Sequence, residues 1–264
     1  MKKLVLLLLI SLPILSCQNA APDFPAGRII DLSHAFDSQT IYWPTEEGFK
    51  LEKEADGMTP AGFYYAANKF CAPEHGGTHI DAPKHFALNS WSVDQIPLDN
   101  LMGAGLVVDV VKHCEANHDY QVSIADLQSW ENQNGTIPKG AIVLLRTGFA
   151  KHWPDRTKYM GTDERGAAAV AKLHFPGLSP EAARWLVANR SFKAIGLDTP
   201  SIDYGQSTLF ESHRVLFERN IPAFENLADL SQLPLKGFKV IALPMKIAGG
   251  SGGPLRVVAL IDKS

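Results

Sequence analysis

The chain has 264 residues, of which 45% are hydrophobic and 20% charged, and its formal net charge is −3. This composition is typical of a soluble globular protein of one or at most two domains and argues against a disordered chain. Neither a basic field nor a Lys/Arg cluster is present, so we expect no nucleic-acid partner. Three cysteines are too few for a disulfide scaffold or a Cys₄ zinc site, so any metal chemistry depends on the nine histidines and the carboxylates.

The first residues predict an export signal rather than a part of the fold. Two lysines precede the apolar run Leu4–Leu15, which is shorter than the about 20 residues that a membrane-spanning helix needs. The run ends in Ser-Cys17, which resembles a bacterial lipobox. We therefore predict a signal peptide over residues 1–16, a lipid on Cys17 and a tether over residues 17–26. The protein would be exported to the cell envelope and meet the membrane only through this lipid; a plain secretory signal and a retained anchor are the alternatives.

Residues 27–264 predict one domain with a β-rich core. Short apolar runs rich in β-branched residues, bounded by Gly, Pro, Lys or Asp, are typical of buried strands. Such runs lie at Arg28–Leu32, Gly105–Val111, Ala141–Arg146, Ala194–Leu197, Val240–Leu243 and Arg256–Ile261, with a further candidate at Gly62–Phe70. The cysteines of this part, Cys71 and Cys114, could pair in an oxidising compartment or stay free.

Helices are expected between these strands. Ser123 can cap a helix over Ile124–Asn132, and Ser179-Pro180-Glu181 is a stronger start signal for a helix that ends near Arg190. A third helix is expected over Phe210–Arg219, because a proline follows shortly after it. Strands outnumber helices, so the pattern predicts a mixed α/β domain.

The most informative segment runs from Glu74 to Phe86. Three of the nine histidines, at positions 75, 79 and 85, fall within eleven residues. Two glycines after His75 argue against a helix, so we expect a loop followed by a short extended stretch in which His79 and Asp81 point the same way. The glycines would let His75 reach the same point, and a proline would turn His85 back toward it. Two imidazoles and a carboxylate suit a divalent ion such as zinc or manganese, which favours a metal site over a solvated turn.

The motif His75-Gly-Gly-Thr-His-x-Asp-Ala-Pro-x-His85 resembles the signature of the cyclase family, which contains bacterial kynurenine formamidases and isatin hydrolases. The resemblance continues at residues 196–203, Gly-Leu-Asp-Thr-Pro-Ser-Ile-Asp, and at residues 244–254, so it covers essentially the whole domain. It implies a single α/β domain with a central β-barrel-like mixed sheet and flanking helices. It also implies a homodimer and a hydrolytic site with one or two divalent metal ions per chain, zinc or manganese.

The resemblance assigns the metal ligands position by position. His75, His79 and Asp81 would hold the first metal, Asp81 would bridge to a second metal held by His213, and Glu225 would touch both. Taken alone, His213 in a predicted helix and Glu225 beyond it would more often be surface polar residues than ligands. The resemblance reverses that expectation for both.

The resemblance also assigns a proton-transfer role to His85 and a substrate contact to Trp43. Trp43 belongs to a group of aromatic residues close in sequence to the metal motif, which predicts an aromatic-lined pocket. From that group we select Phe86 as a second substrate contact. The others are expected to be either pocket or ordinary core: Phe63, Tyr64, Tyr65 and Trp91.

A rival motif lies at Gly249–Gly253, where Gly-Gly-Ser-Gly-Gly formally matches the Gly-x-Ser-x-Gly pattern of serine hydrolases. That pattern requires a strand-to-helix turn with a histidine downstream. Here a proline and a strand-like run follow, and no histidine comes after His213. We therefore reject a serine hydrolase. The segment is either a flexible loop between strands or a loop close to the site or the dimer interface.

These observations predict a metal-dependent amidohydrolase whose partner is a small aromatic amide. The first choice of substrate is N-formylkynurenine, hydrolysed to kynurenine and formate in tryptophan catabolism, and the second is a cyclic aryl amide such as isatin. The export signal departs from family members that act in the cytoplasm, which leaves the physiological substrate open. A non-catalytic envelope lipoprotein that binds metal or ligand is the alternative, but a pure binding site needs no proton-transfer residue such as His85.

Overall fold

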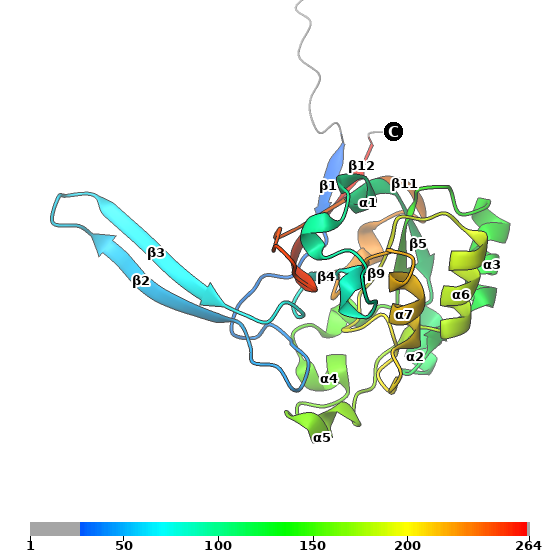
Figure 1. The fold of residues 1–264 in the computed structure, drawn as a ribbon, viewed down its shortest axis with the longest axis horizontal. Helices are drawn as coiled ribbons and strands as arrows, with labels where there is room; N and C mark the ends of the chain where they lie inside the picture. Colours follow the sequence, from blue (N-terminus) through cyan, green and yellow to red (C-terminus); the bar gives the residue numbers. More distant parts are fainter. Residues whose placement is uncertain (1–26, 263–264) are drawn as a thin grey trace, which may run out of the picture.

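The computed structural model describes residues 27–262 (Figure 1). The predicted signal peptide, the lipid site at Cys17 and the tether over residues 17–26 lie outside these residues, so they stay predictions. Within the described part, the helices are too short or too polar for any of them to cross a bilayer.

The core of the fold is a mixed sheet in which seven strands close into a barrel and an eighth, β1 (Arg28–Asp31), extends from β12. Around the barrel the strands follow the order β12 (Gly252–Ile261), β11 (Lys236–Pro244), β5 (Met102–Asp109), β7 (Ile142–Arg146), β9 (Ala194–Leu197), β10 (Ala223–Glu225) and β4 (His79–Asp81). The strands β5, β7, β9 and β10 are parallel to one another, and the other pairings within the barrel are antiparallel. The short strand β4 pairs with both β10 and β12 and so closes the barrel. The predicted fold class is confirmed.

Alternate residues of the central strands enter two different cores. On β7, Ile142 and Leu144 join the apolar cluster inside the barrel, while Val143 and Leu145 join the cluster under the helices. This two-residue period is expected for a strand that is covered on both faces, and it explains why β7 is a continuous apolar run.

Capping residues in the sequence set the first residue of the longer helices that cover the sheet. α3 (Ile124–Asn134) follows a capping box formed by Ser123 and Asp126, and α6 (Pro180–Asn189) follows the N-cap Ser179. α7 (Glu211–Phe217) packs beside α6. The remaining short elements are α1 (Leu98–Leu101), α2 (Val111–Ala116), α4 (Arg156–Met160), α5 (Ala167–Val170), the 3₁₀ turns η1 (Pro83–His85), η2 (Val93–Gln95), η3 (Phe149–His152) and η4 (Leu230–Gln232), and the strand pair β6 (Gln121–Val122) and β8 (Gly177–Leu178).

Three strand predictions need correction. The strand predicted at Gly105–Val111 ends at Asp109, because Val111 already begins α2. The C-terminal strand begins at Gly252, so the last two of the five residues of the predicted Gly249–Gly253 loop are part of β12. The candidate strand at Gly62–Phe70 exists as β3 (Tyr64–Cys71) but is exposed rather than buried.

β3 pairs with β2 (Lys50–Met58), a strand that the sequence analysis did not predict, and the two form a hairpin outside the barrel. Figure 1 shows this hairpin, residues 50–71, extending from the body on the side opposite to α3 and α6; we call it the arm. Six large apolar or aromatic side chains along it are between 49% and 70% exposed: Leu51, Met58, Phe63, Tyr64, Tyr65 and Phe70. Cys71 lies on the arm and Cys114 in the core, and both are free thiols.

Candidate metal centre

The site lies at the strand that closes the barrel. On β4, His79 and Asp81 point to one side while Ile80 between them enters the barrel core, as the alternation of a strand requires. The antiparallel register with β10 places Glu225 directly opposite His79. As a result, His79 Nε2 lies 3.1 Å from Asp81 Oδ1 and 3.5 Å from Glu225 Oε2, with all three side chains buried.

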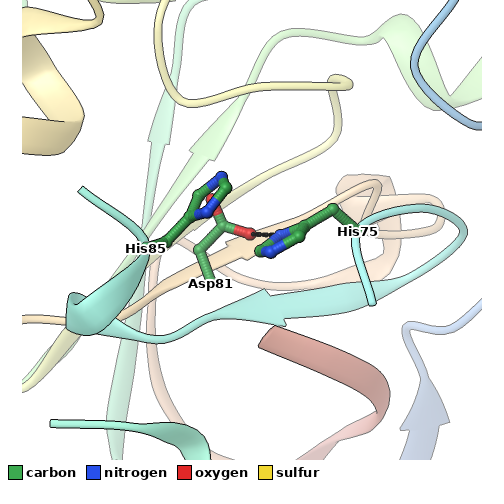
Figure 2. Close-up of side chains that lie close together, drawn as sticks. All are labelled: His75, Asp81 and His85. Carbon is green, nitrogen blue, oxygen red and sulfur yellow. Dashed lines mark hydrogen bonds and ion pairs between the residues drawn. The ribbon is translucent and has the colours of Figure 1, made fainter. Parts of the chain in front are cut away.

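A glycine turn brings His75 to the same point. Gly77 has a positive φ of 57°, and a side chain there would overlap Phe36, while a side chain at Gly76 would overlap the ring of Tyr42. Only glycine fits both positions. The turn leaves His75 Nδ1 at 2.7 Å from Asp81 Oδ1. Figure 2 marks this contact with a dashed line.

His213 comes from α7 and is fixed by a carboxylate that the sequence analysis did not select. Its Nδ1 bonds to Asp203 Oδ2, and its Nε2 lies 3.2 Å from both Asp81 Oδ2 and Glu225 Oε1. Asp203 ends the second family motif, but no local signal shows that it meets a histidine ten residues later. A metal-binding histidine usually donates its second ring N–H to a carboxylate or carbonyl. A search of the sequence for such an acceptor could therefore have pointed to Asp203.

The hydrogen bonds of these histidines fit a bound cation. His79 Nδ1 donates to Gly77 O at 2.9 Å, and His213 Nδ1 donates to Asp203, so in the neutral rings both Nε2 atoms carry lone pairs. Both lone pairs face two buried carboxylates, and His79 Nε2 has no hydrogen-bond partner among the described residues. Acceptors facing acceptors in a buried site repel one another unless a cation lies between them. The nitrogen and oxygen donors suit a divalent ion such as zinc or manganese.

The pKa shifts of the buried histidines and carboxylates also indicate that the site requires positive charge. Burial lowers the pKa of His213, but its bonds to Asp203, Asp81 and Glu225 outweigh burial and raise that pKa well above its usual value. Burial raises the pKa of Asp81, but the neighbouring histidines hold it well below its usual value. The pKa of Glu225 is raised by burial and by the charge of Asp81. Protons on the imidazoles thus supply the charge that a metal ion would supply.

Two groups of possible ligands share Asp81. One contains His79, Asp81 and Glu225, and the other contains Asp81 with His75 and His85; in each, the ligand atoms lie within 4.8 Å of one another. His213 belongs to neither group, but its Nε2 lies 3.2 Å from both Asp81 and Glu225, so the five predicted ligands do meet at one point. The two groups divide them differently from the prediction, because His79 lies with Glu225 and His75 lies with His85. Asp81 belongs to both groups and would be the residue shared by them if two ions were bound. His85 also lies within ligand distance of His75 and Asp81. The geometry therefore allows two roles for His85, the predicted proton transfer and metal binding.

The centre lines one end of a cavity of about 390 Å³ whose other walls are largely apolar. Trp43 and Phe86, the two predicted substrate contacts, both line it, together with residues that the sequence analysis did not select: Ile41, Tyr42, Met160 and Phe210. The aromatic residues Phe63, Tyr64 and Tyr65 lie instead on the exposed arm, and Trp91 packs against the barrel core.

Comparisons with known proteins agree with this architecture. The family described as "Putative cyclase" matches residues 30–204. Isatin hydrolase of Roseibium aggregatum is 31% identical over 249 residues, which cover 91% of this chain and 89% of that protein. Kynurenine formamidase of Salinibacter ruber is 27% identical over 239 residues, which cover 87% and 96%.

The solved structures give the same result. Isatin hydrolase A from Labrenzia aggregata, bound to benzyl benzoate, matches with a TM-score of 0.80 and 32% identity over 89% of this chain and 94% of that one. Isatin hydrolase A from Ralstonia solanacearum matches with the same TM-score and identity over 89% and 92%. Since the family match spans more than half of the chain and these hydrolases cover most of it, the chain belongs to the cyclase family and is related to both isatin hydrolases and kynurenine formamidases.

Proposed function

We propose that the protein is a metal-dependent hydrolase of cyclic aryl amides of the isatin type. The observation that carries this proposal is the cluster of two buried carboxylates and three imidazoles at one end of an aromatic-lined cavity. From the sequence alone, N-formylkynurenine is the first choice of substrate. The higher identity to isatin hydrolase, 31% against 27%, supports the reverse order, with an arylformamide as the second candidate.

The cavity suits a small flat substrate. Its volume of about 390 Å³ lies in the usual range for small-molecule sites, about 300–1,000 Å³. The Phe210 ring is centred 5.2 Å from Phe86 and 6.4 Å from Trp43, so the three rings form one continuous wall beside the centre. An aromatic ring packed on this wall would place its amide toward His79, Asp81 and Glu225.

A divalent ion held by these residues would polarise the amide carbonyl and lower the pKa of a bound water toward neutrality. His85 is the side chain beside the centre that can accept the proton of that water. Burial and the neighbouring histidines lower the pKa of His85 to about 4, against the opposing effect of Asp81. The ring is therefore neutral at pH 7 and free to take a proton and return it to the leaving nitrogen.

Substrate preference tests the proposal. With zinc- or manganese-loaded protein, we expect kcat/KM for isatin to exceed that for N-formylkynurenine by at least about tenfold, equivalent to about 1.4 kcal/mol. An aliphatic formamide should react poorly with either metal, because it leaves the aromatic wall uncovered. Product formation by liquid chromatography, before and after removal of metal with a chelator, measures both effects.

Two outcomes would contradict this order. Faster turnover of N-formylkynurenine would favour the arylformamidase. Tight metal binding without turnover of any aryl amide would favour the non-catalytic binding protein.

We also propose that the chain forms a homodimer through the arm. Leu51 lies opposite Phe70 in the hairpin register and Met58 opposite Tyr64, so apolar pairs are exposed at both ends of the arm. A two-stranded hairpin has little stability of its own in water, and exposed apolar patches of this kind are typical of interfaces. A second copy that packs against the arm would supply the missing cover.

Charged residues on the arm test the dimer. We expect wild type to have twice the mass of one chain in light scattering, and Met58→Asp combined with Phe63→Asp to raise the dissociation constant by about 30-fold or more, as for loss of an interface residue worth about 2 kcal/mol. The matched control is Leu88→Asp, an equally drastic change at a 93% exposed site away from the arm. A monomeric wild type, or a double variant that dimerises as well as the control, would contradict the proposal.

A further inference from the structure

Two features that the proposed mechanism does not use, Glu74 and the serine of the Gly249–Gly253 loop, meet at His75. His75 Nε2 lies 2.9 Å from Ser251 Oγ. Ser251 donates twice to Glu74 Oε2, from Oγ at 2.6 Å and from its backbone N–H at 2.9 Å. On its other side, His75 Nδ1 lies 2.7 Å from Asp81 Oδ1 (Figure 2). The four side chains form one continuous chain of contacts that ends in the metal centre.

The direction of the protons along this chain follows from what each group can donate. A carboxylate only accepts, and a serine hydroxyl has one proton. The short contact with Glu74 therefore uses the Ser251 proton, and the Ser251 oxygen is left to accept from His75 Nε2–H. The neutral ring then carries its lone pair on Nδ1, which faces Asp81. His75 is thus prepared to bind a cation through Nδ1.

The same contacts superficially match a Ser–His–Asp triad, with Ser251 as the nucleophile. In a triad the histidine accepts the serine proton, whereas here that proton is directed to Glu74. Ser251 does not line the cavity, and it precedes the strand β12 rather than a helix. The structure therefore supports the rejection of a serine hydrolase and gives Ser251 a different role.

Backbone hydrogen bonds and close packing hold Ser251 in contact with His75 and Glu74. Ser251 O accepts a hydrogen bond from Ala82 N at 2.8 Å, and Gly252 pairs with Asp81 in the β12–β4 register. A side chain at Gly250 would come within 2.8 Å of Glu74 Oε1, and one at Gly252 within 2.6 Å of His75 Cε1. The loop is therefore pressed against both side chains, which places it at the site and explains why glycines flank the serine.

We propose that Glu74 and Ser251 are positioning residues that fix the ring of His75 with Nδ1 toward the metal. They would do for His75 what Gly77 O does for His79 and Asp203 for His213. This inference rests on the proposed metal centre but not on the identity of the substrate. Loss of such an outer partner typically weakens metal affinity by about 10–100-fold.

Ser251→Ala tests the proposal through zinc affinity, measured with metal-free protein and a competing chelator. We expect affinity to fall by about 10–100-fold, while Ser129→Ala, at an exposed position on α3, leaves it unchanged. Glu74→Gln keeps an oxygen acceptor for Ser251 and should cost less affinity than Glu74→Ala. Because the pair acts as one unit, Ser251→Ala combined with Glu74→Ala should lose little more than Ser251→Ala alone.

A second measurement reports the ring itself. Long-range ¹H–¹⁵N correlation spectra of the zinc-loaded protein should show His75 with its proton on Nε2 in wild type and a disturbed ring in Ser251→Ala. Wild-type zinc affinity and an unchanged His75 signal in Ser251→Ala would overturn the proposal, as would labelling of Ser251 by a fluorophosphonate. Wild-type protein that fails to bind zinc would overturn the metal centre and this proposal together, whereas zinc binding without amide hydrolysis would leave this proposal standing.

Discussion

Replacing His85 with alanine is expected to lower kcat by about 10²-fold or more, the usual scale for loss of a positioned acid–base group, while metal content stays nearly unchanged. His85 is the last residue of η1, outside the β4 strand that carries His79 and Asp81, and its ring stacks on that of His75 with centroids 3.8 Å apart. It can therefore reach a water at the centre without being required to hold the ion. Steady-state kinetics with elemental analysis of the same preparation measures both quantities.

The metal content decides between the two roles that the geometry allows for His85. Loss of metal from His85→Ala would show that this residue is a ligand, in the group that it forms with His75 and Asp81. The matched control is His118→Ala, which removes an exposed imidazole outside the cavity and should change neither quantity.

Glu225→Gln is expected to weaken metal affinity by roughly 10–100-fold or more, at least the loss seen when an outer partner of a ligand is removed. Activity should fall with it and recover partly in excess metal. The substitution keeps the shape, and the amide oxygen can still accept from Ile202 N, which lies 2.7 Å from Glu225 Oε1. The substitution removes the buried negative charge of Glu225 beside Asp81. Two divalent ions need this charge as a ligand, whereas the metal-free protein does not need it.

The metal-free variant gives an independent readout. The pKa of Glu225 is raised by burial and by Asp81, so its ionised form is unfavourable when no cation is present. Metal-free Glu225→Gln should therefore unfold no more readily than metal-free wild type, although it binds metal less tightly. Glu218→Gln, at the exposed C-cap position that follows α7, is the matched control. Wild-type metal affinity in Glu225→Gln would remove this residue from the centre and leave a single-metal site as the better description.

Elements whose signals are local could be predicted from the sequence. The helix at α6 begins at its predicted proline because Ser179 caps it, and β9 spans its predicted residues because its apolar run is buried on both faces. The strand β2 could not be predicted, because Lys-Leu-Glu-Lys-Glu-Ala is rich in residues that are depleted in strands. It forms through its pairing with β3 on the exposed arm, where burial leaves no periodic pattern.

The site residues differ in the same respect: those that are close in sequence could be predicted, and those that only the fold brings together could not. The cluster from His75 to His85 could be predicted, because a strand and a glycine turn bring its residues together within eleven positions. His213 and Glu225 required the family resemblance, since only the barrel topology places them beside Asp81. The partners of the outer histidine nitrogens, Asp203 and Ser251, carry no local signal. Ser251 is 176 residues from His75, so their contact exists only in the folded barrel.

The closure of the barrel at β4 links metal binding to folding. Every predicted ligand precedes residue 226, yet β4 is held on one side by β12, which starts only at Gly252. A chain without its last strand would contain all the ligands but would lack one of the two neighbours that fix His79 and Asp81. Metal binding is therefore favoured only in the closed barrel, and the binding free energy adds to the stability of that state. An ion bound at the centre would thus stabilise the barrel only after β12 has paired with β4.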